Sequence, residues 1–433
     1  MIQMKKITIL LSLIFVCSLV FAQQISLKEQ SIEQFKKENY ALAISLMEKA
    51  LIDNPNDAEI YYYLGYFNHY NAYDSRPLKG YDSSYSNKIL GYFDKALEIN
   101  PNYGDAKYFY LTECSAVAFK EYQNNNLLKV KSNFEKAYSR GAIPDWAIEL
   151  GKNMLNSCDS NAILFTGGDF SLNICLFNQL HFNYRKDITI VPLGLIDRPS
   201  FLLALSNNIS SKIIRGLNIG LTKEQVLDIH PYKWDTLTIS LPVPNALLSR
   251  YSLSNGYEMD WEVAPDLTSN RRVVKIEGEN IRNRTYLSPA KAILLNIIET
   301  NKWERPVYFT NTFEISVVAG LDKYLQNNGL ISRLTPLKTD NTKYKIDIPA
   351  LEKLVLNTKL DDLKTIITND LPRASNIIGL YGYAYFLLAD YYRSIVRKDK
   401  ISEVLEKYKQ NIMIGFDHEY EKGNLDKIEK MLN

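Results

Sequence analysis

The sequence has almost no excess of charge of either sign. Its 433 residues include 51 Lys and Arg against 49 Asp and Glu, a formal net charge of +2. Both excess positive charges, Lys5 and Lys6, lie within the first six residues, so the chain after Ala22 is neutral. A neutral chain has no long-range field with which to hold a nucleic-acid backbone or an anionic membrane surface. We therefore expect neither as a partner.

Cysteine and histidine are also scarce, with four of each in the chain. No two cysteines have C-x-x-C spacing and no histidine lies at ligand spacing from a cysteine, which argues against a zinc site. We expect Cys114, Cys158 and Cys175 to be buried thiols, with a disulfide between Cys158 and Cys175 as the open alternative. The G-x-G-x-x-G and P-loop signatures are missing as well. We predict no metal and no cofactor.

Long apolar runs are missing except at the N-terminus. A basic stretch, Met1–Lys6, is followed by an apolar one, Ile7–Phe21, and compact residues precede Gln23. This layout is typical of a secretory signal peptide, here residues 1–22. The apolar run is shorter than the roughly 20 residues that a spanning helix needs, although an uncleaved anchor is the alternative. We expect a soluble chain exported to the periplasm, with no membrane span after cleavage.

The N-terminal third contains an internal repeat. A short phrase recurs as Met47–Leu51, Phe93–Leu97 and Phe134–Tyr138, and a helix stop follows twice, at Asn54-Pro55 and Asn100-Pro101. An aromatic-rich helix is predicted after each proline. The pattern resembles the tetratricopeptide repeat, a 34-residue pair of antiparallel helices in which a small alanine lets the helices approach and a proline ends the second one.

The spacing of this repeat is longer than 34 residues. Ala50 and Ala96 are 46 positions apart, and Ala96 and Ala137 are 41 apart. We assign the first excess to a loop over Asn71–Ser86 and predict a final capping helix over Pro144–Asn156. Residues 23–156 are thus predicted to form tetratricopeptide-like helical repeats.

Tyrosine is concentrated in this region, with 15 of the chain's 30 tyrosines between Gln23 and Leu150. Most fit core positions of the repeat. The run Tyr61, Tyr62 and Tyr63 cannot face one side of a helix, because neighbours are about 100° apart. Some of these rings must reach the surface, where a ring with a polar tip suits a peptide or a glycan. We predict a partner surface that consists of Tyr61, Tyr62, Tyr63 and Tyr66.

Residues 157–343 have the pattern of an α/β domain with parallel strands. An apolar strand over 162–166 ends in Gly167-Gly168-Asp169 and is followed by a helix over 171–182 and a strand over 188–196. Strand, glycine turn, helix and strand make a βαβ unit, which implies parallel pairing. A second helix, over 290–299, starts after Ser288-Pro289 and precedes a strand over 307–310.

Four blocks of sequence occur in order between residues 160 and 338: Asn161–Thr166 with Gly168-Asp169, Arg185 with Asp187, Leu295–Phe309, and Gly320–Gln326 with Gly329-Leu330 and Arg333–Pro336. They resemble the soluble C-terminal region of large bacterial membrane proteins related to protein O-mannosyltransferases. The resemblance implies an envelope location and a link to glycoprotein assembly. It does not imply sugar transfer, since that activity belongs to a multispan membrane part that this chain lacks. Ser171 also stands where the family carries a second acidic residue, which weakens a metal or phosphosugar role for the glycine loop.

The glycine loop is nevertheless the best candidate ligand site. Gly167, Gly168 and Asp169 follow a strand at the end where open α/β sheets bind ligands, and the next helix start favours anions. Asp169 as a helix cap is the favoured alternative. Arg185 and Arg305 complete the candidate ligand-binding set, with the alternative that Arg185 pairs with Asp187 and Arg305 is a buried structural residue.

The last region, residues 344–433, is predicted to be helical. One or two helices are expected over Leu351–Asn369, and a hairpin of two more over Leu380–Val396 and Ile401–Ile414. The hairpin packs on the α/β domain or forms a dimer surface, and the sequence does not decide between the two.

No catalytic constellation is visible in the sequence, so the leading hypothesis is a non-enzymatic envelope scaffold. Its helical-repeat platform would bind a protein or saccharide partner in glycoprotein or envelope assembly. The alternative is a carbohydrate-active enzyme, or an accessory subunit of a glycosyltransferase, with its site near Asp169. The fold class expected is α + α/β: helical repeats, an α/β domain with parallel strands, and C-terminal helical hairpins.

Overall fold

The computed structural model describes residues 26–73, 85–209, 211, 213–267, 274–276, 279–281, 285–313, 315–339, 345–366, 371–413 and 419–432. The chain divides into two compact units, Met1–Glu113 and Cys114–Asn433. The predicted signal peptide, residues 1–22, and most of the predicted loop Asn71–Ser86 lie outside the described residues.

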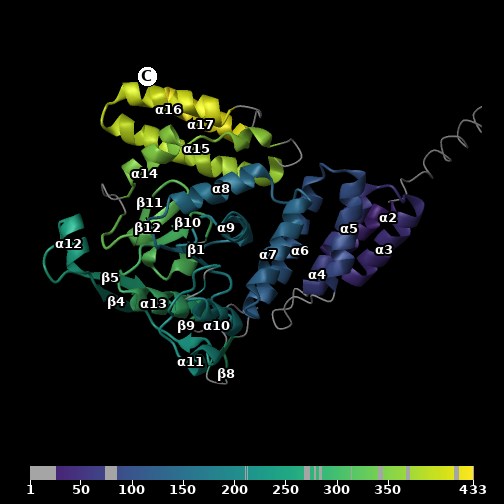
Figure 1. Ribbon diagram of the computed structural model, residues 1–433, viewed down its shortest axis with the longest axis horizontal. Helices are drawn as coiled ribbons and strands as arrows, with labels where there is room; N and C mark the ends of the chain where they lie inside the picture. Colours follow the sequence, from purple (N-terminus) through teal and green to yellow (C-terminus); the bar gives the residue numbers. More distant parts are fainter. Residues whose placement is uncertain are drawn as a thin grey trace, which may run out of the picture. The chain divides into compact units, whose positions relative to one another are not determined.

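The first unit is built from antiparallel helical hairpins, which confirms a repeat-like helical region. Its helices are α2 (Leu27–Lys36), α3 (Tyr40–Asp53), α4 (Ala58–Tyr73), α5 (Ser86–Ile99) and the first half of α6 (Gly104–Gln123). Figure 1 shows α2 with α3 and α4 with α5 as neighbouring pairs. Helices α3 and α5 end at Asn54 and Asn100, each followed by the predicted proline, which cannot continue a helix.

The recurring phrase forms the core of these hairpins. Met47 and Ala50 in α3, and Phe93 and Ala96 in α5, are at most 3% exposed. Gly65 in α4 explains how two helices come so close, because a Cβ atom there would lie 2.5 Å from the ring of Phe93. The third copy of the phrase lies in α7 (Leu127–Ser139) of the second unit, where Phe134 and Ala137 are fully buried.

The second unit is centred on a five-stranded mixed sheet in the order β11-β12-β10-β1-β2. Strands β1 (Ile163–Thr166), β2 (Thr189–Pro192) and β10 (Val307–Thr310) run parallel, as predicted. Strands β11 (Leu325–Asn327) and β12 (Ile331–Leu334) add an antiparallel hairpin that was not predicted. Strand β2 is shorter than the strand predicted over 188–196.

Two helices connect the parallel strands. Helix α9 (Asp169–Phe182) joins β1 to β2, and α13 (Pro289–Asn301), with Ser288 at its N-cap, precedes β10. Because β2 and β10 lie on opposite sides of β1, right-handed crossovers place α9 and α13 on opposite faces of the sheet. Helix α8 (Asp145–Asn156), the predicted capping helix, packs against α9 (Figure 1).

A long insertion between β2 and α13 carries small antiparallel sheets. It contains α10 (Pro199–Asn207), α11 (Lys223–Leu227), α12 (Asn245–Tyr251) and seven short strands: β3 (Tyr232–Lys233), β4 (Leu237–Pro242), β5 (Glu258–Val263), β6 (Asp266–Leu267), β7 (Val274–Ile276), β8 (Glu279–Ile281) and β9 (Thr285–Leu287). Strands β4 and β5 pair as a separate two-stranded antiparallel sheet, and Trp261 of β5 donates a hydrogen bond of 3.1 Å to the Ala319 carbonyl.

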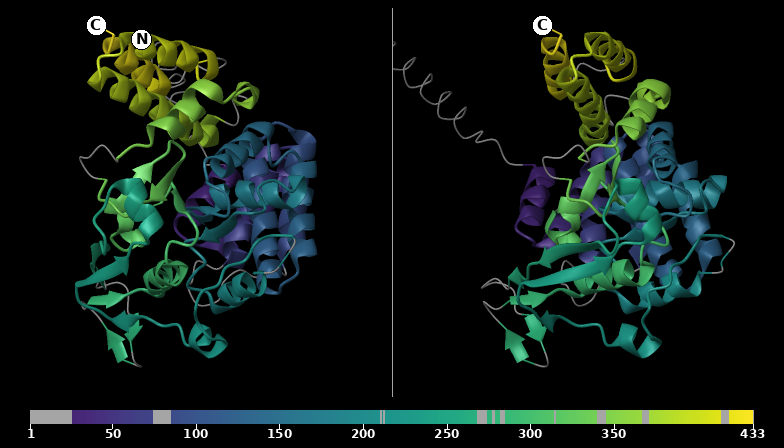
Figure 2. Two further views of the ribbon diagram at one scale, coloured as in Figure 1. Left: turned by 60° about the vertical axis from the view of Figure 1, so that its left-hand side comes forward. Right: turned by 90° about the vertical axis from the view of Figure 1, so that its left-hand side faces the viewer.

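The C-terminal helices belong to the second unit. Helices α15 (Leu371–Ser394), α16 (Lys398–Asn411) and α17 (Glu419–Lys430) form one layer next to α14 (Ile348–Glu352) in Figures 1 and 2. The Tyr381 hydroxyl accepts a hydrogen bond of 2.8 Å from Asn153 in α8, so this layer packs on the α/β domain.

The predicted hairpin is present, but the one or two helices expected over Leu351–Asn369 are shorter and less regular than predicted. After α14 the chain makes one π-helical turn (Lys353–Asn357) and, within the described residues, only a short 3-10 helix (Asp362–Thr365). Asn357 and Thr358 bond back to carbonyls of the preceding turn, which ends it.

Cys114, Cys158 and Cys175 are buried, and no disulfide joins Cys158 to Cys175, as predicted. The pKa of the Cys175 thiol is raised to about 12 because the group is removed from water.

Candidate functional site

Two of the four predicted tyrosines, Tyr63 and Tyr66, lie in an aromatic strip across helices α2, α4 and α6. We define the strip as Phe35 of α2, Tyr63, Tyr66 and Tyr70 of α4, and Phe109 of α6. The ring centroid of Tyr66 lies 5.0 Å from that of Phe35, 4.8 Å from that of Tyr70 and 4.6 Å from that of Phe109. The last two contacts are edge-to-face, the geometry that aromatic quadrupoles favour. Tyr66 thus ties three helices together.

The four tyrosines predicted as a partner surface separate into different environments. Tyr62 is buried, with its ring 5.1 Å from Tyr103, so it serves the core between the helices. Tyr63 and Tyr66 are partly exposed, and burial raises the pKa of each hydroxyl. Tyr61 faces away from the strip, toward α5, where it is an electrostatic neighbour of Tyr92. Helical periodicity requires this separation.

The glycine loop at the carboxyl end of β1 is closed by the segment that follows β10. The Gly167 amide donates to Thr310 Oγ1 at 2.9 Å, and the Thr312 hydroxyl donates to the Gly167 carbonyl. A Cβ atom at Gly167 would lie 2.7 Å from the side chain of Phe313. The glycine is therefore required for close packing of two segments, at the place where a ligand would enter such a sheet.

Asp169 is the first residue of α9, and the cap residue is Gly168, with φ of 82°. The expected capping bond from the Asp169 side chain is not formed, which corrects that alternative. Asp169 is exposed by accessible area, yet the protein around it desolvates the carboxylate and raises its pKa. Its position in the first helical turn supplies a favourable dipole interaction instead.

Arg185 and Arg305 lie at the opposite, amino edge of the sheet. Strand β1 separates the two edges by about 13 Å at the usual strand rise. Arg305 donates to the carbonyls of Asn161 and Ala162 at 2.8 and 2.9 Å. Its third bond, of 2.7 Å, goes to Thr189 Oγ1, and burial lowers the pKa of this arginine to about 10. The predicted ligand set therefore does not converge on one place.

Arg185 binds the end of α8 and the turn after it. Its guanidinium donates to the carbonyls of Leu155, Cys158 and Asp159 at 2.8 to 3.3 Å. It also pairs with Asp187 at 2.9 Å, which raises the pKa of Arg185 and lowers that of Asp187. Arg185 and Arg305 together hold the backbone of residues 155–162.

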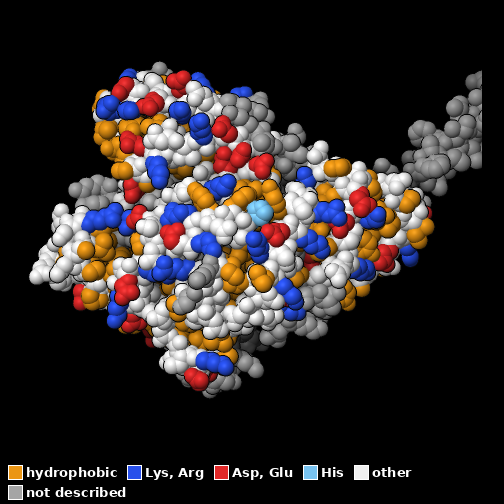
Figure 3. Space-filling model, viewed as in Figure 1, with side chains coloured by type: hydrophobic (Ala, Val, Ile, Leu, Met, Phe, Trp, Pro, Cys, Tyr) orange, Lys and Arg blue, Asp and Glu red, His pale blue; other side chains and the backbone are white. Residues whose placement is uncertain are grey.

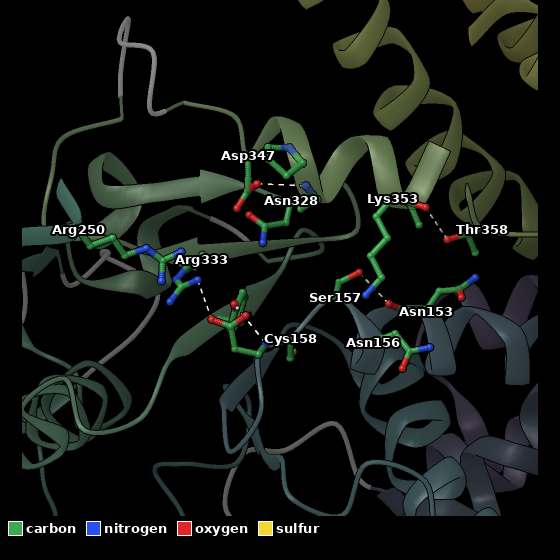
Figure 4. Close-up of a pocket in the computed structure, with 15 residues that line it drawn as sticks. Asn153, Asn156, Ser157, Cys158, Arg250, Asn328, Arg333, Asp347, Lys353 and Thr358 are labelled. Carbon is green, nitrogen blue, oxygen red and sulfur yellow. Dashed lines mark hydrogen bonds and ion pairs between the residues drawn. The ribbon is translucent and has the colours of Figure 1, made fainter. Parts of the chain in front are cut away.

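The segment that these arginines hold forms one wall of a polar cleft of about 450 Å³. We name it the amino-edge cleft. Its lining comes from the end of α8 and the turn after it, the end of α12, strand β10, the β11–β12 hairpin and the segment from Asp347 to Thr358 (Figure 4): Asn153, Asn156, Ser157, Cys158, Asp159, Arg250, Tyr308, Asn328, Arg333, Asp347, Pro349, Ala350, Lys353, Leu354 and Thr358. Most of these side chains are polar.

Arg333 is the most deeply buried charge of the amino-edge cleft. It lies in the fully buried strand β12, and its guanidinium is 2.7 Å from the Asp159 carboxylate and 5.7 Å above the ring centre of Tyr308. Burial opposes its charge, but Tyr308, Asp159, Tyr251 and Asp347 outweigh this effect and raise the pKa of Arg333. Arg333 therefore stays protonated.

Two further groups define the upper wall of the cleft in Figure 4. Asp347 caps α14 by accepting a bond of 3.1 Å from the amide of Ala350. Asn328 is 3% exposed, and its Oδ1 has no hydrogen-bond partner among the described residues. An unsatisfied buried amide oxygen is costly, so this group lacks a stabilising hydrogen bond among the described residues.

The cleft residues were not predicted as a site from the sequence. Asp159 and Asp347 resemble ordinary turn and cap residues, and Asn328 precedes a glycine turn. One signal was available: Arg333 sits in an apolar stretch between Ile331 and Leu334, and an arginine in a buried strand needs a charged partner.

Charges of both signs are interspersed over the face of the molecule shown in Figure 3. That face has no large patch of one sign. Within the part of the chain that the structure describes, no helix is long and apolar enough to cross a membrane. The described residues also contain no group of three or more His, Cys, Asp or Glu side chains that could hold a metal ion.

Part of the chain matches a protein-family model. A family model described as TMEM260-associated domain 2 matches residues 265–351, about a fifth of the chain. This segment runs from β6 into α14 and contributes Tyr308, Asn328, Arg333 and Asp347 to the cleft. No tetratricopeptide family model matches, and no curated protein matches. The result is a weak link to a glycosylation-related membrane protein family, and it supports the predicted resemblance in part.

Proposed function

We propose that this protein is an exported envelope scaffold, which binds a protein or saccharide partner through its helical hairpins during glycoprotein or envelope assembly. The observation that carries the proposal is the aromatic strip. Helices α2, α4 and α6 each contribute a partly exposed ring to it, from Phe35 through Tyr66 to Phe109. Aromatic rings held by their neighbours lose little conformational freedom when a partner binds, which makes them effective binding anchors.

The chemistry of the strip fits a partner with both apolar and hydroxyl groups. Tyr70 is 36% exposed, and Tyr63 and Tyr66 expose part of their rings. At one end Lys28 is bound to Asp57 and Glu59 at 3.1 and 2.6 Å, so charges lie beside the strip in neutralised form. A sugar ring or an aromatic peptide side chain can pack on the rings while the hydroxyl groups bond to it.

The location and the process rest on the sequence and on the family link. The N-terminal leader pattern supports export, and the match over residues 265–351 supports a connection with glycosylation. We further propose that the hairpins of the first unit are tetratricopeptide repeats. They share with that repeat the paired helices, a buried alanine at each helix crossing and a terminal proline.

The test compares the strip with a tyrosine elsewhere. We expect the pair Tyr63→Phe and Tyr70→Ser to reduce recovery of envelope partners, and binding on a glycan array, by about tenfold, because one aromatic anchor and two hydroxyl groups that contact the partner are changed. Tyr383→Ser, at a ring that is 45% exposed in α15, is the matched control. Equal recovery by the strip variants and the control, with both proteins folded, would reject the aromatic strip as the binding surface.

The rival function, a carbohydrate-active enzyme or glycosyltransferase subunit with its site near Asp169, keeps one favourable observation. Asp169 is exposed at the carboxyl end of the sheet, and desolvation raises its pKa in the direction that a general acid requires. Asp169 would act without Arg305, because Arg305 donates to the Asn161 carbonyl at the other edge of the sheet. In this case Asp169→Asn abolishes turnover of an envelope glycan while the melting temperature stays the same. A fall in stability alone would assign Asp169 a structural role.

A further inference from the structure

The amino-edge cleft combines an excess of positive charge with several neutral polar groups. Three cationic side chains, Arg250, Arg333 and Lys353, line it against the two carboxylates of Asp159 and Asp347. Asp159 is neutralised by Arg333 at 2.7 Å. The cleft as a whole therefore carries one surplus positive charge, which an anionic group on a ligand would balance.

The cations lie at two ends of the cleft. In Figure 4 Arg250 and Arg333 lie next to each other on one side, while the Lys353 side chain points toward Ser157 and Asn153 on the other. Lys353 thus faces the C-terminal end of α8, where the helix dipole is negative. The negative end of the α8 dipole already balances part of the charge of Lys353. The pair Arg250 and Arg333 is therefore the better place for a ligand anion.

The uncharged polar groups between these two ends suit a ligand that carries hydroxyl groups. The Asn328 amide is buried, lines the cleft and has an oxygen without a partner, and a half-turn of the amide would exchange its oxygen with its nitrogen. Asn156, Ser157 and Thr358 add further polar atoms to the lining. A ligand hydroxyl can both donate to such an amide and accept from it.

The shape and the lining exclude two simpler ligands. Tyr308 is the aromatic residue of the lining, but it is 1% exposed and Arg333 covers its ring, so it offers no platform for the apolar face of a neutral sugar. A simple carboxylate would leave the Asn328 oxygen without a donor. A volume of about 450 Å³ also lies in the range of small-molecule sites.

We propose that the amino-edge cleft binds an acidic sugar, meaning a saccharide unit that carries a carboxylate or a phosphate group. The anionic group lies between Arg250 and Arg333, and the hydroxyl groups bond to Asn328 and to the end of α8. The match over residues 265–351 does not assign this site, and the proposal is independent of the aromatic strip in the first unit.

The test is calorimetric titration of the full chain at low salt with D-glucuronate, D-glucose 6-phosphate, D-glucose and acetate. We expect at least one acidic sugar to bind about tenfold more tightly than glucose and acetate, with affinity falling as salt is added. The first two probes distinguish a carboxylate from a phosphate. Equal binding of glucose, or no binding of either acidic sugar at about 10 mM, would overturn the proposal.

Two variants separate ligand binding from folding. Arg250→Gln changes an exposed side chain and is expected to weaken the acidic sugar about tenfold, whereas Arg198→Gln, an exposed arginine outside the cleft, leaves binding unchanged. Asn328→Leu removes an unsatisfied buried amide, so binding falls while the melting temperature is kept or raised. If Arg250→Gln binds as well as Arg198→Gln, the anion does not lie at Arg250.

Discussion

Two arginines at the amino edge of the sheet each hold several backbone carbonyls at once. Arg305 binds two carbonyls and a threonine hydroxyl, and Arg185 binds three carbonyls and a carboxylate. A planar guanidinium with five donors can satisfy such a set, and a lysine cannot. A guanidinium group is suited to bind an external anion, but these two arginines bind the backbone of the protein itself.

We predict that Arg305→Lys lowers the free energy of unfolding by about 1–3 kcal/mol, because at least one buried carbonyl loses its donor. Urea unfolding followed by tryptophan fluorescence measures the change. Arg198→Lys, at an exposed position, is the control and should stay within about 0.5 kcal/mol of the unchanged chain. Identical midpoints for the two variants would show that the Arg305 bonds contribute nothing to stability.

Glu149 in α8 makes stability depend on pH. Burial, together with Asp361 and Asp362, raises the pKa of Glu149 to about 7, although the Asp362 amide donates to its carboxylate and Lys152 acts in the opposite direction. The unfolded chain loses this proton near pH 4.5 and the folded chain near pH 7. The folded state is therefore favoured at low pH, and the advantage is lost as pH rises through this window.

We predict that Glu149→Gln is more stable than the unchanged chain at pH 8 by about 1–3 kcal/mol, and that the gain disappears near pH 5. Urea unfolding at both pH values gives the two differences. Glu304→Gln, at an exposed glutamate, serves as the control and should show no such pH-dependent gain. A gain for Glu149→Gln that is equal at both pH values would contradict the assignment of the titration to Glu149.

At the scale of helices, the contact between α4 and α5 depends on the missing side chain of Gly65. We predict that Gly65→Ala destabilises the first unit, since its Cβ would lie 2.5 Å from the Phe93 ring and the overlap, about 1–3 kcal/mol, exceeds the gain in helix propensity. Gly91→Ala in α5 has open space around its Cβ and should stabilise by about 0.5–1 kcal/mol. Thermal melting of the two variants gives opposite signs if the packing argument holds.

The elements that the sequence predicted well are those whose signal is local. Strands β1 and β10 are continuous apolar runs bounded by glycine or proline, and α13 begins with Ser288 and a proline at its first turn. Strands β11 and β12 were missed because three or four residues that include Gln326 and Arg333 give no period. Their pairing depends on the sheet that they join.

The candidate sites follow the same division. The aromatic strip was partly predictable, since tyrosines at helical spacing must separate into core and surface. The amino-edge cleft was not, because each of its residues alone has an ordinary explanation and only the fold brings them together. The glycine loop was predicted at the right edge of the sheet, but Phe313 and the two threonines that close it lie almost 150 positions further along the chain.

At the scale of the whole chain, the C-terminal helices complete the second unit. Tyr381 and Ala384 are fully buried, and Leu354 is 2.5 Å from the position of a Cβ atom at Gly329. Removing these helices would uncover apolar surface on α8 and on the sheet. The α/β domain expected over 157–343 therefore has no complete core without residues 344–433.

We predict that a chain ending at Lys343 is insoluble or aggregated, or melts at least about 10 °C lower than the full chain, because several buried side chains lose their partners at once. Size-exclusion chromatography and calorimetry distinguish these outcomes. A monomeric fragment with an unchanged melting temperature would show that the α/β domain folds alone.

The amino-edge cleft also has a place in the order of events as the chain is made. Its walls come from residues 153–159, 250, 328–333 and 347–358, so the last wall leaves the ribosome long after the first. The helical hairpins of the first unit can mature during that interval, while the cleft is still open on one side. A ligand can therefore bind the complete cleft only after the second unit has been synthesised and folded. Binding of the ligand thus indicates that both steps are finished.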